Sequence, residues 1–219
     1  MRIQKTDLVN QVYETLKQNI LNGNLAPETP LRQEELSDTL GVSRQPISHA
    51  LVLLEREGLV SELGRKGKMV TKVDAQHLSD LYQVRAELDG LAAYLCAQNP
   101  SPALSSTLET SLQQGRDAIK ARSIDALLQA DIAFHRALYE HSGNPEIGRI
   151  ADNSWNHLVR AMHQVLNDNS IHESVWSDHE QIAQAILAGE ADQARELARV
   201  HANSSGRMTF LRLNSPVQQ

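Results

Sequence analysis

The sequence predicts a mainly α-helical protein in two parts, of which only the first carries a short β-hairpin. Over most of the chain, apolar residues recur every three or four positions, which is the spacing of one face of an α-helix. The alternation typical of strands is confined to residues 59–73, around a turn that contains glycine. Because no strand signal remains beyond it, we predict a first domain at residues 1–74 and an all-α domain of six helices at residues 75–219.

Composition restricts the classes of protein to which the chain can belong. Its 219 residues are 41% hydrophobic but only 4% aromatic, so aliphatic side chains must fill the cores. A single cysteine, Cys96, excludes an intrachain disulfide framework. The polar start at residues 1–10 lacks the apolar core of a signal peptide, and no apolar run approaches the roughly 20 residues of a membrane span. We therefore expect a soluble, cytoplasmic protein.

The distribution of charge separates the two parts. The whole chain has a formal net charge of −6, which by itself argues against a nucleic-acid partner. Residues 1–74 are neutral overall, so the acidic excess lies entirely in the second part. Such a local difference matters more for DNA binding than the total charge. Residues 61–72 hold only one acid, Glu62, against the basic residues Arg65, Lys66, Lys68 and Lys72.

The elements of the first part follow from its apolar spacing and its breaks. Helical spacing predicts a first helix that Asn22-Gly23-Asn24 ends, and two prolines hold the turn after it. Gly41 then separates two shorter helices, and the hairpin completes the part. We expect helices at residues 6–21, 33–40 and 43–58 and the hairpin at residues 59–73.

The two shorter helices have the features of a helix-turn-helix. Gly41 permits the tight turn between them. Ser43 is placed to cap the second helix, and Pro46 falls in its first turn, where a missing N–H costs little. The start of a recognition helix enters the major groove of DNA. The exposed face at this start carries the hydrogen-bonding residues Arg44, Gln45, Ser48 and His49.

These side chains suit the recognition of bases and phosphates. We expect Gln45 to read an adenine and Arg44 to hold a phosphate or a guanine. The hairpin would act as a wing that brings Lys66, Gly67 and Lys68 beside the DNA backbone or the minor groove. The alternative is that the helix face is merely solvated, and the charged wing argues against it.

The first part closely resembles the N-terminal signature of GntR-family regulators, in order and in spacing. The resemblance lies in Leu25-Ala26-Pro27, Leu31-Arg32-Gln33-Glu34-Glu35-Leu36, Leu40-Gly41-Val42-Ser43-Arg44, Pro46 and Glu57-Gly58-Leu59-Val60. It implies that residues at or beside the DNA include Arg32, Ser43, Arg44, Gln45, Ser48, Lys66 and Gly67. The family often has Arg-Glu where this chain has Ser48-His49, so no operator sequence can be carried over. Helix-turn-helix proteins favour two-fold symmetry, and we expect a homodimer on a palindromic, double-stranded DNA operator.

Helical spacing dominates the second part to its end. Its helices are interrupted by short segments rich in Ser, Asn, Gly and Pro, which favour helix ends and turns. The predicted helices are residues 75–98, 102–121, 124–141, 145–167, 171–188 and 191–212.

Three of these helices carry metal-binding residue types on their apolar faces. Asp131 and His135 lie four residues apart, and so on one face of their helix. His179 and His201 lie within the apolar stripes of the last two helices. Burying these groups unpaired would cost several kcal/mol, and a divalent metal would satisfy all of them. The alternative is a hydrogen-bond network in which Asp131 pairs with one histidine.

The second part also resembles the FCD ligand-binding domain of FadR-type GntR regulators, and its six helices resemble the shorter, VanR-like branch. The resemblance rests on Asp131-Ile132-Ala133-Phe134-His135-Arg136-Ala137-Leu138, Ser142-Gly143-Asn144-Pro145, His179 and His201. It implies that Asp131, His135, His179 and His201 are metal ligands. This ligand set suits several metals, and we expect zinc, with nickel or manganese as alternatives.

An effector with a carboxylate would complete a metal shell of this kind. Arg85 borders the apolar stripe of its helix, and it resembles the arginine of the family's first helix that faces the pocket. We expect Arg85 to pair with the effector's carboxylate. The alternative is a surface ion pair with Asp89, four residues on. Asn153 and His157, at the edge of their helix's stripe, are further candidates for the pocket wall.

The sequence is therefore interpreted as that of a DNA-binding transcription regulator, a repressor controlled by a small organic acid, and not as that of an enzyme. A metal-dependent hydrolase with an accessory winged-helix domain is the alternative. Against it, no separate carboxylate is placed as a general base, and four protein ligands suit anchoring better than turnover. A structural metal without an effector is the third possibility.

Overall fold

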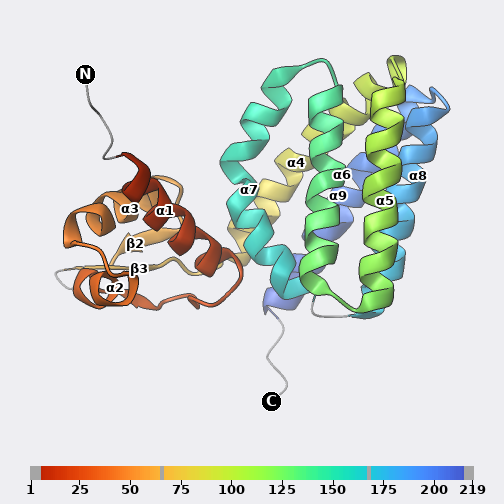
Figure 1. Ribbon diagram of the computed structural model, residues 1–219. Helices are drawn as coiled ribbons and strands as arrows, with labels where there is room; N and C mark the ends of the chain where they lie inside the picture. Colours follow the sequence, from red (N-terminus) through yellow and green to blue (C-terminus); the bar gives the residue numbers. More distant parts are fainter. Residues whose placement is uncertain (1–5, 65–66, 167–168, 215–219) are drawn as a thin grey trace, which may run out of the picture. The chain divides into compact units, whose positions relative to one another are not determined.

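The computed structural model describes residues 6–64, 67–166 and 169–214 (Figure 1). The chain divides into two compact units, Met1–Val73 and Asp74–Gln219. Among the described residues, no helix is both long enough and apolar enough to cross a membrane.

The first unit combines three helices with a small antiparallel sheet. The core forms where α1 packs on α3, through buried residues such as Leu16 and Ile20 of α1 and Ile47 and Leu54 of α3. The elements are α1 (Thr6–Leu21), β1 (Pro30–Leu31), α2 (Gln33–Leu40), α3 (Arg44–Arg56), β2 (Val60–Glu62) and β3 (Lys68–Val70). These bounds confirm the predicted helix-turn-helix followed by a hairpin.

The sheet contains one strand more than we predicted. Its order is β1-β3-β2, so β1 pairs with the hairpin, with Leu31 opposite Lys68. Two residues are too few to show an alternation, and Pro30 reads as a turn in the sequence. Because proline cannot donate to a ladder, an edge strand is where it is tolerated. The segment expected to be only a turn therefore continues into the sheet and buries Leu31.

The turn between α2 and α3 is held differently from our expectation. Gly41 takes the left-handed conformation, φ 65°, that its place in the turn requires. Ser43 occupies the N-cap position of α3, but its side chain makes no capping hydrogen bond. Ser37 of α2 instead closes the turn, since its hydroxyl donates to the carbonyl of Val42 and its carbonyl accepts from the Val42 N–H. The predicted cap is wrong, and the Ser43 side chain is exposed.

The second unit is a bundle of long helices. Its N-caps follow the predicted breaks, since Asp74, Ser101, Ser123 and Asn144 accept backbone N–H groups at the starts of four helices. The helices are α4 (Ala75–Gln98), α5 (Pro102–Ala121), α6 (Ile124–His141), α7 (Pro145–Val165), α8 (His172–Leu187) and α9 (Ala191–Asn214), with a 3₁₀ turn η2 (Asn169–Ile171) before α8. Figure 1 shows α5 and α6 running side by side, as their extensive packing requires.

Two glycines let the helices of the bundle approach closely. A Cβ added at Gly206 of α9 would lie 2.5 Å from the Cβ of Tyr82, where α9 packs on α4. A Cβ added at Gly115 of α5 would lie 1.7 Å from the indole of Trp176 of α8. That indole is buried, and its Nε1 donates to the Leu112 carbonyl at 2.9 Å. The Gly115 position therefore seats the tryptophan that lies beside His179.

Gly115→Ala is expected to destabilise the protein although alanine favours a helix. The new methyl group overlaps the buried indole, and overpacking of this kind costs about 1–3 kcal/mol. Gly148→Ala in α7 is the matched control, because its Cβ meets nothing closer than 3.7 Å and the change should stabilise by up to about 1 kcal/mol. Urea unfolding of both variants measures the difference. Equal stability of the two would contradict the packing described here.

Candidate metal centre and nucleic-acid interface

Three histidines from three helices meet inside the second unit. His135 of α6, His179 of α8 and His201 of α9 are all buried. One nitrogen from each lies within 4.8 Å of the others, and the Nε2 atoms of His179 and His201 are 3.1 Å apart. Such a group of imidazoles has the spacing of ligands around one metal ion.

Asp131 joins these histidines from one turn earlier on α6. Its Oδ1 lies 3.5 Å from His179 Nε2, and its Oδ2 lies 3.9 Å from His135 Nε2. The structure therefore brings the four predicted residues together. The Asp131 carboxylate faces Nε2 of His179, which also faces Nε2 of His201. The periodicity of the three apolar stripes was the signal that located them.

The unsatisfied atoms of this cluster fit a divalent cation. Asp131 Oδ2 and Nε2 of His135 face each other at 3.9 Å, and both are buried without a hydrogen-bond partner among the described residues. Nδ1 of His135 and Nδ1 of His179 are also unsatisfied, but each lies across its ring from Nε2, so the same cation does not reach them. Each such atom costs about 1–3 kcal/mol if it stays unpaired. The alternative network, in which Asp131 pairs with one histidine, is poorly formed, because the Asp131 oxygens lie 3.5 and 3.9 Å from the histidine nitrogens, longer than a normal hydrogen bond. Nitrogen and carboxylate donors at this spacing are what zinc and its neighbours bind.

The protonation of the histidines also suits a metal. Burial, together with the nearby His201 and His135, places the pKa of His179 well below its usual value. Burial and the Arg85 guanidinium likewise lower the pKa of His135. Both rings are therefore neutral at pH 7 and keep a nitrogen lone pair for a cation.

A second layer of carboxylates lies behind two of the histidines. Asp89 Oδ2 lies 3.2 Å from Nδ1 of His135, and Asp178 Oδ2 lies 3.2 Å from Nδ1 of His201. Asp89 is buried, whereas the side chain of Asp178 is 46% exposed. Sequence reasoning missed both roles, and considered Asp89 only as a surface partner of Arg85. Neither carboxylate lies within four residues of its histidine, so spacing held no signal for them.

Arg85 makes the ion pair with Asp89 that the sequence offered as the alternative to effector binding. Its Nε donates to Asp89 Oδ2 at 3.2 Å, but this ion pair is buried, so the expected surface pair is wrong in its location. Its Nη1 lies 3.9 Å from Met162 Sδ, a weak contact for a guanidinium. Burial alone would lower the pKa of Arg85, but Asp89, together with Tyr139, Tyr82 and Asp131, opposes this effect and raises the pKa. The arginine therefore stays charged inside the bundle.

A small cavity adjoins both the cluster and Arg85. It measures about 30 Å³, which is room for about two water molecules. Its walls include Arg85, Asp131 and His201, together with Tyr82, Met162, Met208 and Thr209. His157 does not line it and packs instead against the ring of His77, with 5.4 Å between centroids. The side chain of Asn153, the other candidate, lies outside the described residues.

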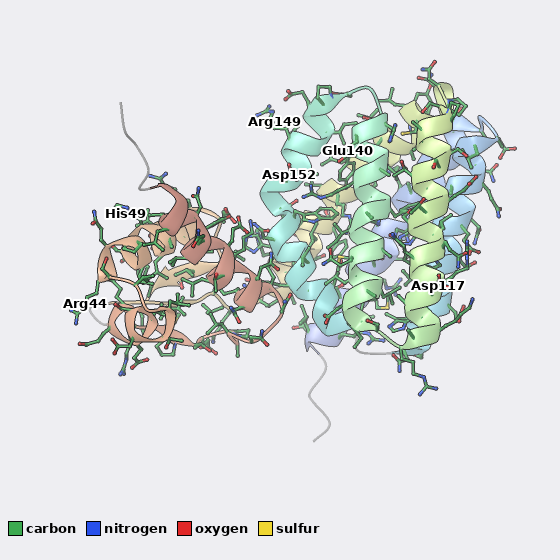
Figure 2. The ribbon with its side chains drawn as sticks, in the orientation of Figure 1. Arg44, His49, Asp117, Glu140, Arg149 and Asp152 are labelled. Atoms are coloured by element: carbon green, nitrogen blue, oxygen red, sulfur yellow. The ribbon has the colours of Figure 1, made fainter. Side chains whose placement is uncertain are left out.

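The predicted DNA-reading residues gather at the start of α3. Gln45 is exposed and Ser48 is half-buried. Figure 2 shows Arg44 and His49 projecting outward from the first unit. In the wing, Gly67 is exposed with φ 108°, and Lys66 lies outside the described residues. The surface thus offers a mixture of hydrogen-bonding and cationic side chains.

Three of the predicted cations are already paired with glutamates. Arg44 contacts Glu34 at 2.7 Å, and Arg32 contacts Glu35 at 3.0 Å, both at exposed positions. Exposed pairs of this kind contribute little stability and exchange readily. Lys68 is different, because it is half-buried and contacts Glu55 of α3 at 2.6 Å. Sequence reasoning missed all three glutamates. Of these, Glu55 holds Lys68 against its own domain.

Comparisons with known proteins agree with this geometry. A family model described as the FCD domain matches residues 80–204, and one described as "Bacterial regulatory proteins, gntR family" matches residues 8–70. An HTH-type transcriptional regulator of *Streptomyces ambofaciens* is 32% identical over 196 residues, which cover 87% of this chain and 80% of that protein. The regulator YdhC of *Bacillus subtilis* is 28% identical over 198 residues, which cover 88% of this chain and 87% of that protein.

Solved structures share the fold. *Escherichia coli* McbR/YncC matches with a TM-score of 0.80 at 20% identity, over 95% of this chain and 100% of that one. A GntR regulator from *Rhodococcus* sp. RHA1 matches with a TM-score of 0.78 at 22% identity, over 93% and 98%. The relatives are transcription regulators, so the chain is not an enzyme and the hydrolase alternative is not supported. The chain belongs to the GntR family of bacterial regulatory proteins, as a transcriptional regulator that joins a helix-turn-helix DNA-binding domain to an FCD effector-binding domain.

Proposed function

We propose that this regulator is a repressor whose affinity for its operator is controlled by a small organic acid bound beside a metal ion. The observation that carries the proposal is the meeting of three buried imidazoles and Asp131 at a cavity that also exposes the charged Arg85. A structural metal alone would not require a buried cation in the cavity wall. A carboxylate ligand would pair with the terminal nitrogens of Arg85, beyond the contact that its Nε makes with Asp89.

Each residue of the site has a separate task in this proposal. Asp131, His135, His179 and His201 hold the metal, for which zinc is the first candidate and nickel or manganese the alternatives. The ion supplies an electrophilic anchor for one effector oxygen. Arg85 binds the carboxylate through its terminal nitrogens, because its Nε is engaged by Asp89. Protein ligands alone need not fill a five- or six-coordinate shell, which leaves a position for the acid.

The size of the cavity supports a link between effector binding and movement. A volume of about 30 Å³ is smaller than an organic acid, so the proposal includes an outward shift of the cavity walls when the acid binds. Met162 of α7 and Met208 of α9 are unbranched and repack readily. An acid that fits only the enlarged cavity shifts the population toward that state. We propose that this state binds the operator less tightly.

The outer face of α4 is the surface we propose for dimerisation. Its apolar residues follow the alternating three- and four-residue spacing of a coiled-coil seam. Val84 and Leu91 are 56% and 37% exposed, and the others are half-buried. A seam on a single helix is self-complementary about a two-fold axis, so the partner it fits is a second copy of the chain. The seam consists of Leu81, Val84, Leu88, Leu91 and Leu95.

Removal of a proposed metal ligand should abolish tight zinc binding. His179→Gln is expected to weaken zinc affinity by more than about 100-fold, beyond the range of outer-layer substitutions. His141→Gln is the control, since His141 ends α6 outside the cluster. Competition with a chromophoric chelator measures both affinities. Undiminished affinity in His179→Gln would contradict the ligand assignment.

The zinc-loaded wild-type protein can be used to test the proposed binding of an organic acid. In a thermal-shift screen of small carboxylic acids on the zinc-loaded chain, some acid should raise the unfolding temperature and lower DNA affinity. Arg85→Gln should lose both effects and still bind zinc. Zinc binding without a response to any acid would instead support a purely structural metal.

Arg44 should contribute to operator binding and Arg56 should not. Both are exposed arginines on α3, but Arg56 lies twelve residues further along, about 18 Å from the proposed reading end. Arg44→Ala is expected to weaken binding to the DNA beside the protein's own gene by about 1–3 kcal/mol, or about 5- to 150-fold. Arg56→Ala should change it less than about threefold. Gel-shift titrations decide, and equal losses would refute the assignment of the reading face.

A charge in the α4 seam should dissociate the dimer. Val84→Glu buries a carboxylate between two copies, whereas Val200→Glu makes the same change at a valine of α9 that is equally exposed, at 52%, and outside the seam. Light scattering should give twice 24.3 kDa for the wild type and for Val200→Glu, and 24.3 kDa for Val84→Glu. A dimeric Val84→Glu variant would show that the copies meet elsewhere.

A further inference from the structure

The carboxylate of Asp89 is surrounded by three polar side chains. The hydroxyl of Tyr139 donates to its Oδ1. Its other oxygen, Oδ2, accepts from Nε of Arg85 and lies 3.2 Å from Nδ1 of His135. Asp89 itself is buried on α4, and the proposed function gives it no task. One oxygen atom thus touches both a proposed metal ligand and the proposed effector-binding arginine.

The charge of Asp89 is secured by these same neighbours. Burial alone would raise the pKa of the carboxyl, but the Arg85 guanidinium and the His135 ring oppose this and hold the pKa well below its usual range. A buried carboxylate is costly unless its partners compensate it. Geometry places a polar group at each oxygen of the carboxylate, with Tyr139 at Oδ1 and Arg85 and His135 at Oδ2.

We propose that Asp89 is a positioning residue that orients His135 toward the metal and shares one oxygen with Arg85, so that the metal and anion sites influence each other. This inference rests on the proposed function and specifies how its two halves are connected. In this proposal, Asp89 itself contacts neither the metal ion nor the anion.

Two physical effects make the arrangement suitable. A carboxylate beside one ring nitrogen of a histidine favours the tautomer with a proton there, which leaves Nε2 free as a metal ligand. Nε2 is the nitrogen of His135 that faces Asp131. Arg85 and His135 both contact Oδ2 of Asp89. A turn of Arg85 toward an anion would therefore change the contact between Asp89 and His135. Coupling between binding sites is reciprocal, so the metal must then change the affinity for the anion by the same factor.

The first experiment measures zinc affinity by chelator competition, with zinc alone as the probe. Asp89→Asn keeps the shape of the side chain but cannot accept from all three partners, and affinity should fall by about 10- to 100-fold. Asp117→Asn is the matched control on α5, where Figure 2 shows the aspartate at the surface, and its affinity should stay within twofold. The visible absorption of the cobalt-loaded variants should differ only for Asp89→Asn, because it reports ligand geometry rather than stability.

The second experiment tests the connection to Arg85 by a double-mutant cycle. Arg85→Gln should alter zinc affinity in two ways: it removes a positive charge near the metal site, and it changes the contact between Asp89 and His135. In the Asp89→Asn background only the first effect remains. We expect the factor caused by Arg85→Gln to differ at least fivefold between the two backgrounds. Factors that agree within twofold would overturn the connection.

A third measurement avoids substituting the buried carboxylate. In the zinc-loaded, ¹⁵N-labelled protein, the proton on His135 Nδ1 should give a slowly exchanging signal that Arg85→Gln moves. Arg116→Gln is the control, because this half-buried arginine of α5 pairs with Glu180 instead. An unmoved signal refutes the inference even if Asp89→Asn fails to fold. If the wild type binds no zinc, the proposed metal site itself fails; if it binds and Asp89→Asn is unchanged, only the present inference fails.

Discussion

The second unit depends on one constraint: polar atoms buried among helices must find partners. Its interior contains a charged arginine, two carboxylates and three histidines in contact with one another. Helices α4, α6, α8 and α9 each contribute to this group, so their packing is fixed as much by these contacts as by apolar burial. An apolar bundle would be simpler to stabilise. The polar centre makes sense as a binding site that the surrounding helices hold in place.

Most of the fold could be predicted because its signals are local. Helix spacing, the N-caps and Gly41 act within one or two turns, and the helices of the second unit begin within one residue of the predicted positions. Strand β1 was missed because its pairing with β3 joins segments almost forty residues apart. The hydroxyl that holds the tight turn belongs to Ser37 rather than Ser43. Ser37 lies on α2, and its hydroxyl donates to the Val42 carbonyl on the other side of Gly41.

The candidate site was predictable only in part, for the same reason. Inward-facing Asp131, His135, His179 and His201 follow from helical periodicity. Asp89 and His135 are 46 positions apart, and no periodicity within a helix connects them. The size of the cavity likewise depends on how Met162 and Met208 pack from different helices. The residues proposed to bind could be inferred from the sequence, whereas the residues proposed to orient them required tertiary structure.

The glutamates that face the reading arginines bear on how the protein responds to salt. In the proposed complex, where Arg44 and Arg32 contact phosphates, Glu34 and Glu35 would lose their partners and attract cations from solution. This uptake offsets part of the counterion release that normally drives DNA binding. Electrostatic attraction to arbitrary DNA is thereby weakened, while contacts to base edges keep their value. With these contacts the regulator would give up some general affinity for DNA, and a larger share of its binding energy would depend on sequence.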